Sequence, residues 1–180
     1  QELAVVEAMK MENLLRAEQD GKVSKIHAEP GSSLAVFGAG NVGLAAIMAA
    51  QLSGVTRIIA VDKDRKRLAL AKELGATDTL VHGAGTVLEI KDLVGDKLNY
   101  SVEATDGENL VSEAVAALGV LGTCAMVGGA AATEFVKVNH PDFLLHGKRL
   151  IGVVGGGGQT PMFLEALMDL QLQGRFPVEK

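Results

Sequence analysis

The stretch SLAVFGAGNVG, residues 33–43, decides the fold. It begins with five small or apolar residues, too few for a helix, and then carries three glycines in the spacing G-x-G-x-x-G. Residues 41–52 continue with alanine, isoleucine, methionine and leucine on all sides, which predicts a buried helix. A buried strand that passes through a glycine-rich turn directly into a buried helix is typical of a parallel α/β sheet.

Short apolar runs alternate with helical patterns along the rest of the chain. We expect further strands at 57–61, 77–81, 98–103, 123–127 and 149–154, and helices at 64–74, 87–94, 107–118 and 161–172. Gly75 is placed to end a helix, Pro161 to begin one, and His140 with Pro141 to form a turn. The pattern predicts an α/β fold with a doubly wound, six-stranded parallel Rossmann sheet.

Each glycine of the loop has a mechanical interpretation. Gly38 permits the tight turn, Gly40 lets a ligand approach the backbone, and Gly43 lets the helix pack closely on the strand. Free N–H groups and the positive dipole end of the helix then receive phosphates. Turn glycines alone could produce this pattern, but its place between strand and helix favours a cofactor site that includes Asn41 and Val42.

Asp62 ends the second expected strand, about 20 residues beyond the glycine loop. A carboxylate there accepts hydrogen bonds from the hydroxyls of the adenosine ribose and repels a 2′-phosphate. Lys63, Arg65, Lys66 and Arg67 follow and offer positive charge to such a phosphate, but we interpret them as a solvated helix face. The sequence therefore predicts the dinucleotide NAD(H) as partner, rather than NADP(H).

Composition, charge and missing motifs argue against several other classes of protein. The chain has 180 residues and a net charge of −5, which does not favour nucleic acid or a membrane surface as partner. No apolar run reaches membrane-spanning length, and neither a signal-peptide pattern nor the G-x-x-x-x-G-K-[ST] loop of nucleotide hydrolases is found. The single cysteine, Cys124, excludes an internal disulfide and is interpreted as a small core residue. We expect a cytoplasmic protein.

Residues 30–180 resemble the coenzyme-binding domain of zinc-dependent medium-chain alcohol dehydrogenases, nearest to the aryl-alcohol group. The resemblance is carried by the glycine loop and by IIAVDKDRKRLALAKELGATDTL, SVEAT, AMVGG and LIGVVGGG. It implies that Asp62 and Arg67 contact the adenosine ribose and that Thr105 lies near the ribose on the nicotinamide side. It also implies that the nicotinamide is bordered by the backbone around Val127, Gly128, Gly152 and Val154.

Members of that family bind a catalytic zinc, a Lewis acid for hydride transfer, on a separate N-terminal domain. Nothing before Ser32 resembles that domain. The potential zinc ligands of this chain are interpreted as core, loop or surface residues: Cys124, His27, His82, His140 and His146. We therefore expect no metal site and no catalytic residue. This chain alone is expected to bind cofactor without oxidising alcohols. Because the family pairs through its last strand, the resemblance also implies a homodimer through residues 149–154.

Residues 1–34 resemble the C-terminal half of a biotinyl carrier domain of acyl-CoA carboxylases. The motif EAMKMEN, residues 7–13, carries the match, and Lys10 corresponds to the lysine that accepts biotin. The resemblance implies a β-hairpin, and Asp20 with Gly21 fits a hairpin turn. Without it, residues 3–18 are rich in helix formers and predict a helix. Half a carrier domain leaves its core face exposed, so we expect poor biotinylation.

The two resemblances meet at PGSSLAV, residues 30–36, which divides the chain into a partial carrier-like segment, 1–31, and an NAD-binding Rossmann domain, 32–180. No low-complexity linker separates them, which suggests a chimera made by engineering or recombination. Three functions stay open: the coenzyme-binding domain of an alcohol dehydrogenase-type oxidoreductase, a biotin carboxyl carrier fragment, and a structural chimera without activity. Coenzyme titration tests the first of them and streptavidin reactivity tests the second.

Overall fold

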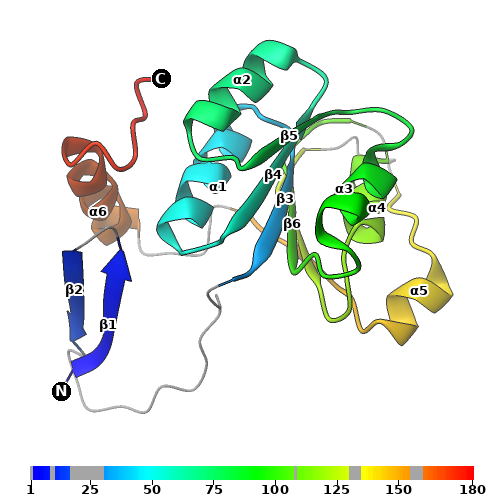
Figure 1. The fold of residues 1–180 in the computed structure, drawn as a ribbon, viewed down its shortest axis with the longest axis horizontal. Helices are drawn as coiled ribbons and strands as arrows, with labels where there is room; N and C mark the ends of the chain where they lie inside the picture. Colours follow the sequence, from blue (N-terminus) through cyan, green and yellow to red (C-terminus); the bar gives the residue numbers. More distant parts are fainter. Residues whose placement is uncertain (1, 9–10, 17–30, 108, 130–134, 155–159) are drawn as a thin grey trace.

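A computed structural model describes residues 2–8, 11–16, 31–107, 109–129, 135–154 and 160–180 (Figure 1). Six parallel strands form one sheet in the order β5-β4-β3-β6-β7-β8. Their bounds are Ser33–Phe37 (β3), Arg57–Asp62 (β4), Asp78–Val81 (β5), Tyr100–Glu103 (β6), Thr123–Met126 (β7) and Arg149–Gly152 (β8). The chain builds the sheet outward from β3 to one edge and then from β6 to the other. The doubly wound parallel sheet expected from the sequence is therefore confirmed.

Helices cover both faces of this sheet. In Figure 1, α1 (Asn41–Leu52) and α2 (Arg65–Glu73) lie on one side, and α3 (Thr86–Val94) and α4 (Leu110–Ala116) on the other. Two more helices, α5 (His140–Leu145) and α6 (Thr160–Leu172), precede and follow β8. None of the described helices is long and apolar enough to cross a membrane.

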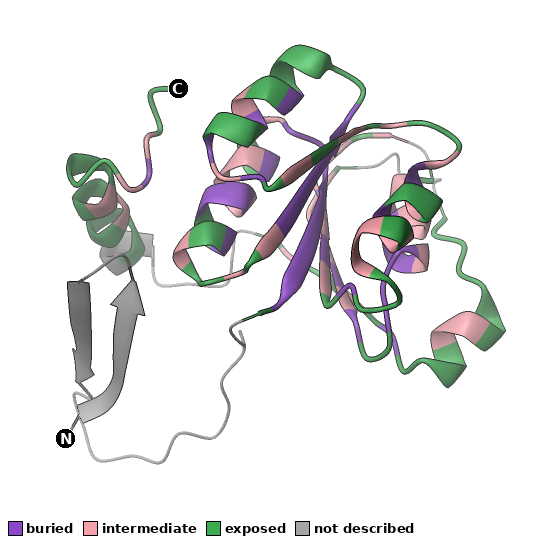
Figure 2. Cartoon of the chain, in the orientation of Figure 1, coloured by how far each residue is buried: buried purple, intermediate pink, exposed green. Residues whose placement is uncertain are grey.

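Strand β3 contributes to the core on each face of the sheet, because successive side chains of a strand point to opposite faces. Ala35 and Phe37 of β3 pack in the core under α3 and α4, whereas Leu34 and Val36 pack in the core under α1 and α2. All residues of β3 are buried, and the purple band through the centre of Figure 2 marks this layer. Burial on both faces explains why β3 is apolar without alternation.

Several element bounds shift by one or two residues from the sequence-based expectations, among them the strand expected at 98–103, which begins at Tyr100. The helix expected at 107–118 begins only at Leu110, because Asn109 adopts a positive φ of 64°. The last strand ends at Gly152 instead of residue 154. The turn expected at His140 and Pro141 is wrong, since these residues begin α5. The side chain of Asn139 caps that helix by accepting a hydrogen bond from the N–H of Asp142 (3.1 Å), and proline is tolerated in a first helical turn.

The N-terminal segment forms two antiparallel strands, β1 (Glu2–Ala8) and β2 (Met11–Arg16), in which Ala8 is paired with Met11. The hairpin expectation is confirmed and the alternative of a helix over residues 3–18 is wrong. Strand pairing satisfies the backbone groups that a helix would otherwise satisfy, and the β-branched pair Val5 and Val6 favours the strand. Lys10 and the turn expected at 20–21 lie outside the described residues.

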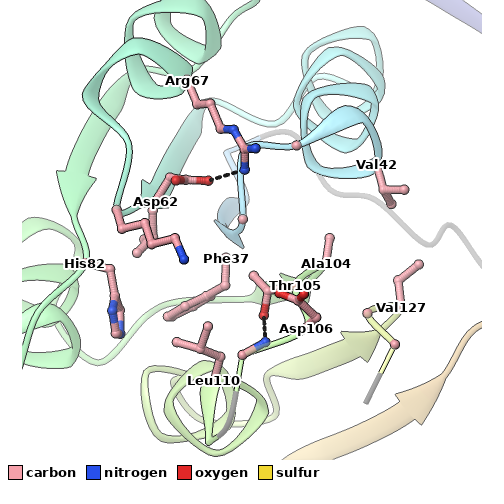
Figure 3. Close-up of a pocket in the computed structure, with 17 residues that line it drawn as sticks. Phe37, Val42, Asp62, Arg67, His82, Ala104, Thr105, Asp106, Leu110 and Val127 are labelled. Carbon is pink, nitrogen blue, oxygen red and sulfur yellow. Dashed lines mark hydrogen bonds and ion pairs between the residues drawn. The ribbon is translucent and has the colours of Figure 1, made fainter. Parts of the chain in front are cut away.

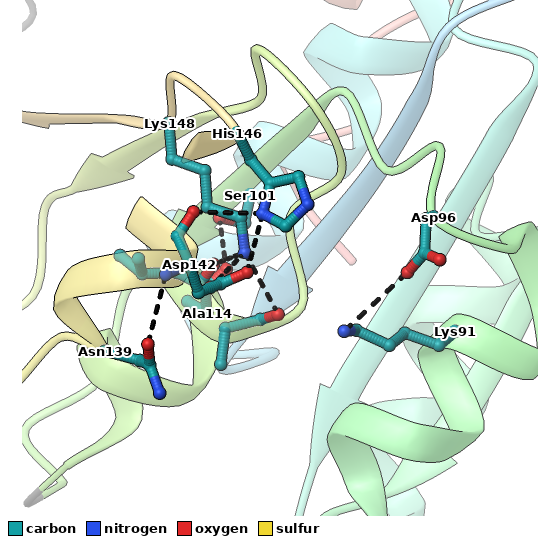
Figure 4. Close-up of polar contacts among 10 residues, drawn as sticks. Lys91, Asp96, Ser101, Ala114, Asn139, Asp142, His146 and Lys148 are labelled. Atoms are coloured by element: carbon teal, nitrogen blue, oxygen red, sulfur yellow. Dashed lines mark hydrogen bonds and ion pairs between the residues drawn. The ribbon is translucent and has the colours of Figure 1, made fainter. Parts of the chain in front are cut away.

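A buried lysine ties α5 to the end of α4. The side chain of Lys148 is only 1% exposed, and its ammonium nitrogen lies 2.6 Å from a carboxylate oxygen of Asp142 (Figure 4). It also donates to the carbonyl oxygens of Val115 (3.3 Å) and Ala116 (3.5 Å), at the C-terminal end of α4. His146 contacts the other carboxylate oxygen of Asp142 at 2.9 Å. The cluster stabilises a helix end whose last carbonyl groups have no partner within the helix.

This cluster predicts an acid-sensitive contribution to stability. Burial alone would raise the pKa of Asp142, but the hydrogen bond and charge of Lys148, together with those of His146, lower it below its usual 3.8. A lowered pKa in the folded state contributes stability above the unfolded pKa, and that stability disappears as pH falls through the folded pKa. Urea unfolding should therefore show a steeper loss of stability below about pH 4 for the unmodified chain than for Asp142→Asn. Parallel pH profiles would contradict this.

Candidate functional site

The glycine loop joins β3 to α1 at the carboxyl edge of the sheet. Gly38 has a φ of 94°, and its N–H donates to the carbonyl oxygen of Val61 at 2.8 Å. A Cβ on Gly43 would collide with the carbonyl oxygen of Gly38 and lie 3.3 Å from Cγ1 of Val36. A Cβ on Gly40 would enter open space. The first and third glycines therefore serve the turn and the packing, as expected, and the second borders free space.

The N-terminus of α1 is open to an anion. Gly40 caps the helix without a side-chain hydrogen bond, and the first turn contains no acidic residue. The first N–H groups of a helix have no partner within it, and the helix dipole places positive charge there. Asn41 and Val42 belong to this first turn. These features suit an anionic group such as a phosphate, as at other helix N-termini.

Asp62 lies at the end of β4, and the carboxylate is also part of the loop's architecture. One carboxylate oxygen accepts a hydrogen bond from the N–H of Ala39 (2.7 Å) and the other from the N–H of Asp64 (2.8 Å). The residue is 7% exposed, and a guanidinium nitrogen of Arg67 lies 4.0 Å away (Figure 3). Sequence reasoning assigned Asp62 only to ribose binding and missed this second role, because a contact with Ala39 depends on strand pairing.

Two further carboxyl-edge loops complete the site. Glu103 ends β6 and is 2% exposed, and its carboxylate accepts hydrogen bonds from the N–H (2.7 Å) and from the hydroxyl of Thr105. The backbone oxygen of Glu103 accepts from the N–H groups of Val127 (2.9 Å) and Gly128 (3.0 Å), which follow β7. These bonds hold the loops after β6 and β7 against each other.

A pocket of about 450 Å³ opens between these loops and the start of α1 (Figure 3). Eight of the twelve residues expected at the cofactor line it: Gly38, Gly40, Val42, Asp62, Arg67, Thr105, Val127 and Gly128. Gly43 lies behind the loop, and Asn41 is exposed beside it. Gly152 and Val154 do not line this pocket. Val154 is 94% exposed and lies beyond the end of β8.

Several lining residues were missed from the sequence. His82 directly follows β5 and Phe37 ends β3, so their place at the carboxyl edge of the sheet could have identified them. His82 was interpreted only as a loop residue, but its Nε2 lies 2.9 Å from a carboxylate oxygen of Glu113. The basic residues after Asp62 are exposed as expected, yet Lys63 and Arg67 also face the pocket. No signal in the sequence indicated Leu110, which begins α4.

Cys124 behaves as a core residue rather than a reactive one. It is fully buried in β7, and burial raises the pKa of its thiol, to which the negative charge of Glu103 adds while a hydrogen bond with Ser101 opposes it. A raised pKa keeps the thiol protonated and weakly nucleophilic. In the part of the chain that the structure describes, no three histidine, cysteine, aspartate or glutamate side chains are grouped closely enough to hold a metal ion.

Comparisons with known proteins agree with both resemblances. Residues 41–171 match the family model of zinc-binding dehydrogenases, and residues 1–38 match that of biotin-requiring enzymes. The chain is 31% identical over 160 residues to a geraniol dehydrogenase of Castellaniella defragrans, which covers 88% of this chain and 43% of that protein.

Two solved structures show the same architecture. An alcohol dehydrogenase zinc-binding domain protein from Burkholderia ambifaria is 40% identical to this chain. Its TM-score is 0.80, and the match covers 83% of this chain and 41% of that chain. Benzyl alcohol dehydrogenase from Acinetobacter calcoaceticus is 37% identical, with a TM-score of 0.81 over 87% and 44%. This chain thus spans less than half the length of each relative. Because the family match runs from the first residue of α1 into α6, the chain belongs to the family of zinc-binding dehydrogenases.

Proposed function

We propose that residues 32–180 bind NAD(H) as the coenzyme-binding domain of an alcohol dehydrogenase-type oxidoreductase. One observation carries the proposal: the open N-terminus of α1 lies in a pocket with Asp62 at one end and Thr105, Val127 and Gly128 at the other. The helix start suits a pyrophosphate. The oxygen acceptors on either side suit the hydroxyls of two riboses, so the pocket matches the order of groups in a dinucleotide.

The preference for NAD(H) is tested by fluorescence titration with NADH and NADPH. Because Asp62 accepts ribose hydroxyls and repels a phosphate, NADH should bind at least about tenfold more tightly than NADPH. Asp62→Ala should lose at least about tenfold in NADH affinity and most of the discrimination against NADPH, since a hydrogen bond to a charged group is worth about 1.5–3 kcal/mol.

Arg67→Ala is the matched control, because it removes a positive side chain at the same end of the pocket and keeps the carboxylate. It should weaken NADPH more than NADH. Circular dichroism of each variant checks the fold, because Asp62 also holds the backbone of Ala39. A folded, unmodified chain that binds neither coenzyme would refute the proposal, and equal affinities would refute the preference.

We further propose that this chain alone binds coenzyme without oxidising alcohols. This chain aligns with less than half of each of these relatives. NAD-dependent oxidation of benzyl alcohol or geraniol, followed by NADH absorbance in the presence of zinc, tests the point. Turnover by the purified chain would show that it is catalytically complete.

A second candidate function concerns the N-terminal segment. Its match to biotin-requiring enzymes and the pairing of β1 with β2 favour a carrier hairpin, and we propose that the chain is a chimera of the two families. Biotinylation at Lys10 is tested with a biotin ligase, ATP and biotin, followed by a streptavidin blot. Lys10→Arg is the control. A streptavidin signal from the unmodified chain and none from Lys10→Arg supports the carrier function. No signal from either protein favours a chimera without this activity.

A homodimer through β8 is the proposed assembly. This strand pairs with β7 on one side and ends the sheet on the other, and Ile151 within it is 47% exposed. An open, apolar strand edge favours pairing with another strand. Sedimentation velocity should show a dimer that Ile151→Lys converts to monomer, because the added charge would be buried at the junction. A monomer in both samples would contradict this assembly.

A further inference from the structure

Glu103 is a buried carboxylate that the proposed function leaves without a role. It ends β6 at the edge of the pocket and is 2% exposed, so it has been removed from water at a substantial cost in free energy. One of its carboxylate oxygens accepts hydrogen bonds from both the N–H and the hydroxyl of Thr105. The carboxylate is thus directed at one neighbour, and that neighbour lines the pocket.

The contact decides how the hydroxyl of Thr105 can interact with a ligand. A threonine hydroxyl has one hydrogen to donate and two lone pairs to accept with, whereas a carboxylate only accepts. The hydrogen of Thr105 is committed to Glu103, and the hydroxyl oxygen accepts the N–H of Gly107 at 3.1 Å. One lone pair remains, so Thr105 can accept a further hydrogen bond but has no hydrogen left to donate.

Packing holds this arrangement in place. A Cβ on Gly128 would collide with the carbonyl oxygen of Thr105 and lie 2.7 Å from the second carboxylate oxygen of Glu103. A Cβ on Gly38 would lie 2.6 Å from the methyl group of Thr105. The two side chains therefore fit between two backbone segments that approach them closely at glycines. Rotation of the threonine would need one of these segments to move.

The start of α1 and Thr105, which both border the pocket, thus differ in chemistry. The start of α1 offers N–H donors and positive charge, which suits phosphate. Thr105 offers an acceptor beside a buried carboxylate, which suits a hydroxyl donor and disfavours an anion. We propose that Glu103 is a positioning residue that makes the hydroxyl of Thr105 an obligate acceptor and so selects a ribose hydroxyl at this end of the pocket. The inference rests on the proposed dinucleotide function and names the residue that orients the ligand there.

ADP and ADP-ribose test the proposal, because they share the adenosine and the pyrophosphate and differ by the second ribose. Calorimetric titration should show ADP-ribose binding about tenfold more tightly than ADP to the unmodified chain, as expected for one or two added hydrogen bonds. Thr105→Val and Glu103→Met should each reduce this ratio to about twofold or less and leave ADP affinity unchanged within about twofold. The double variant should lose no more than either single variant, because both remove the same interaction.

The conservative variants separate positioning from charge and cover the case in which Glu103→Met does not fold. Glu103→Gln keeps an oxygen at the same reach and should retain most of the ADP-ribose advantage. Glu103→Asp keeps the charge but is one methylene shorter, so it should lose the ADP-ribose advantage. Thermal midpoints of all variants report the fold.

Four outcomes are informative against the proposal. The proposal is overturned if Glu103→Met keeps the full preference for ADP-ribose over ADP. It is also overturned if Glu103→Met loses ADP and ADP-ribose affinity equally, because Glu103 would then have only a structural role. If Glu103→Asp keeps the preference for ADP-ribose and Glu103→Gln loses it, the negative charge of Glu103 is what matters, and the positioning role is overturned. A folded, unmodified chain that binds neither ADP nor ADP-ribose refutes the dinucleotide function itself, a result distinct from the other three.

Discussion

Gly43→Ala should lower the thermal midpoint by about 4–8 °C and abolish measurable NADH binding. The added Cβ would collide with the backbone oxygen of Gly38 and approach Cγ1 of Val36, and neither the oxygen nor the buried strand can move freely. Overpacking costs about 1–3 kcal/mol and occasionally more, and each kcal/mol corresponds to about 2–4 °C in a domain of this size. The collision with a backbone oxygen places this variant at the upper value of about 3 kcal/mol. Alanine gains up to about 1 kcal/mol in helix propensity, which leaves a net loss of about 2 kcal/mol.

Gly40→Ala is the matched control, because it makes the same substitution three residues earlier in the same loop. Its Cβ would enter open space, and the residue lines the pocket. We expect a midpoint within about 2 °C of the unmodified chain and NADH affinity at least about tenfold weaker, because the methyl group occupies the place where the pyrophosphate approaches. Scanning calorimetry and NADH titration separate the two effects. Equal midpoints for both variants would contradict the packing role of Gly43.

Lys148→Met should cost about 3 kcal/mol in the free energy of unfolding. The variant keeps most of the buried stem but removes the ammonium group that contacts Asp142 and the carbonyl oxygens of Val115 and Ala116. Removing the ammonium group takes a buried donor away from Asp142 and from both carbonyl oxygens, which is more costly than losing an exposed ion pair. Urea unfolding should show a lower midpoint with an unchanged slope.

Lys91→Met is the corresponding surface control. Lys91 lies 3.7 Å from Asp96, whose side chain is 84% exposed (Figure 4). An ion pair in water contributes about 0–1 kcal/mol, so this variant should unfold close to the unmodified chain. A comparable loss in both lysine variants would show that burial of Lys148 is not the cause. NADH affinity should stay unchanged in both, because neither residue lines the coenzyme pocket.

The glycine loop and the order of elements were predictable because they depend on local chemistry. A continuous apolar run marks a strand buried on both faces, and three glycines mark a turn that a side chain would block. Asp62 was predictable from its distance along the chain to the loop. His140 and Pro141 were misread as a turn, because proline fits both a turn and a first helical turn, and only the cap by Asn139 distinguishes them.

By itself, the sequence determined the parallel Rossmann sheet, the loop at its carboxyl edge and the acidic residue at the end of the second Rossmann strand. These features follow from hydrophobic pattern and spacing, which are local properties of the chain. Only the tertiary structure decided that Asp62 holds the backbone of Ala39, that Glu103 directs Thr105, and that Lys148 is buried at the end of α4. The contacts of Asp62 and Lys148 join groups that lie far apart in the chain. The contact of Glu103 with Thr105, two residues away, is held in place by the close approach of Gly38 and Gly128. The formation of these contacts depends on strand order and packing distance, which no local pattern encodes.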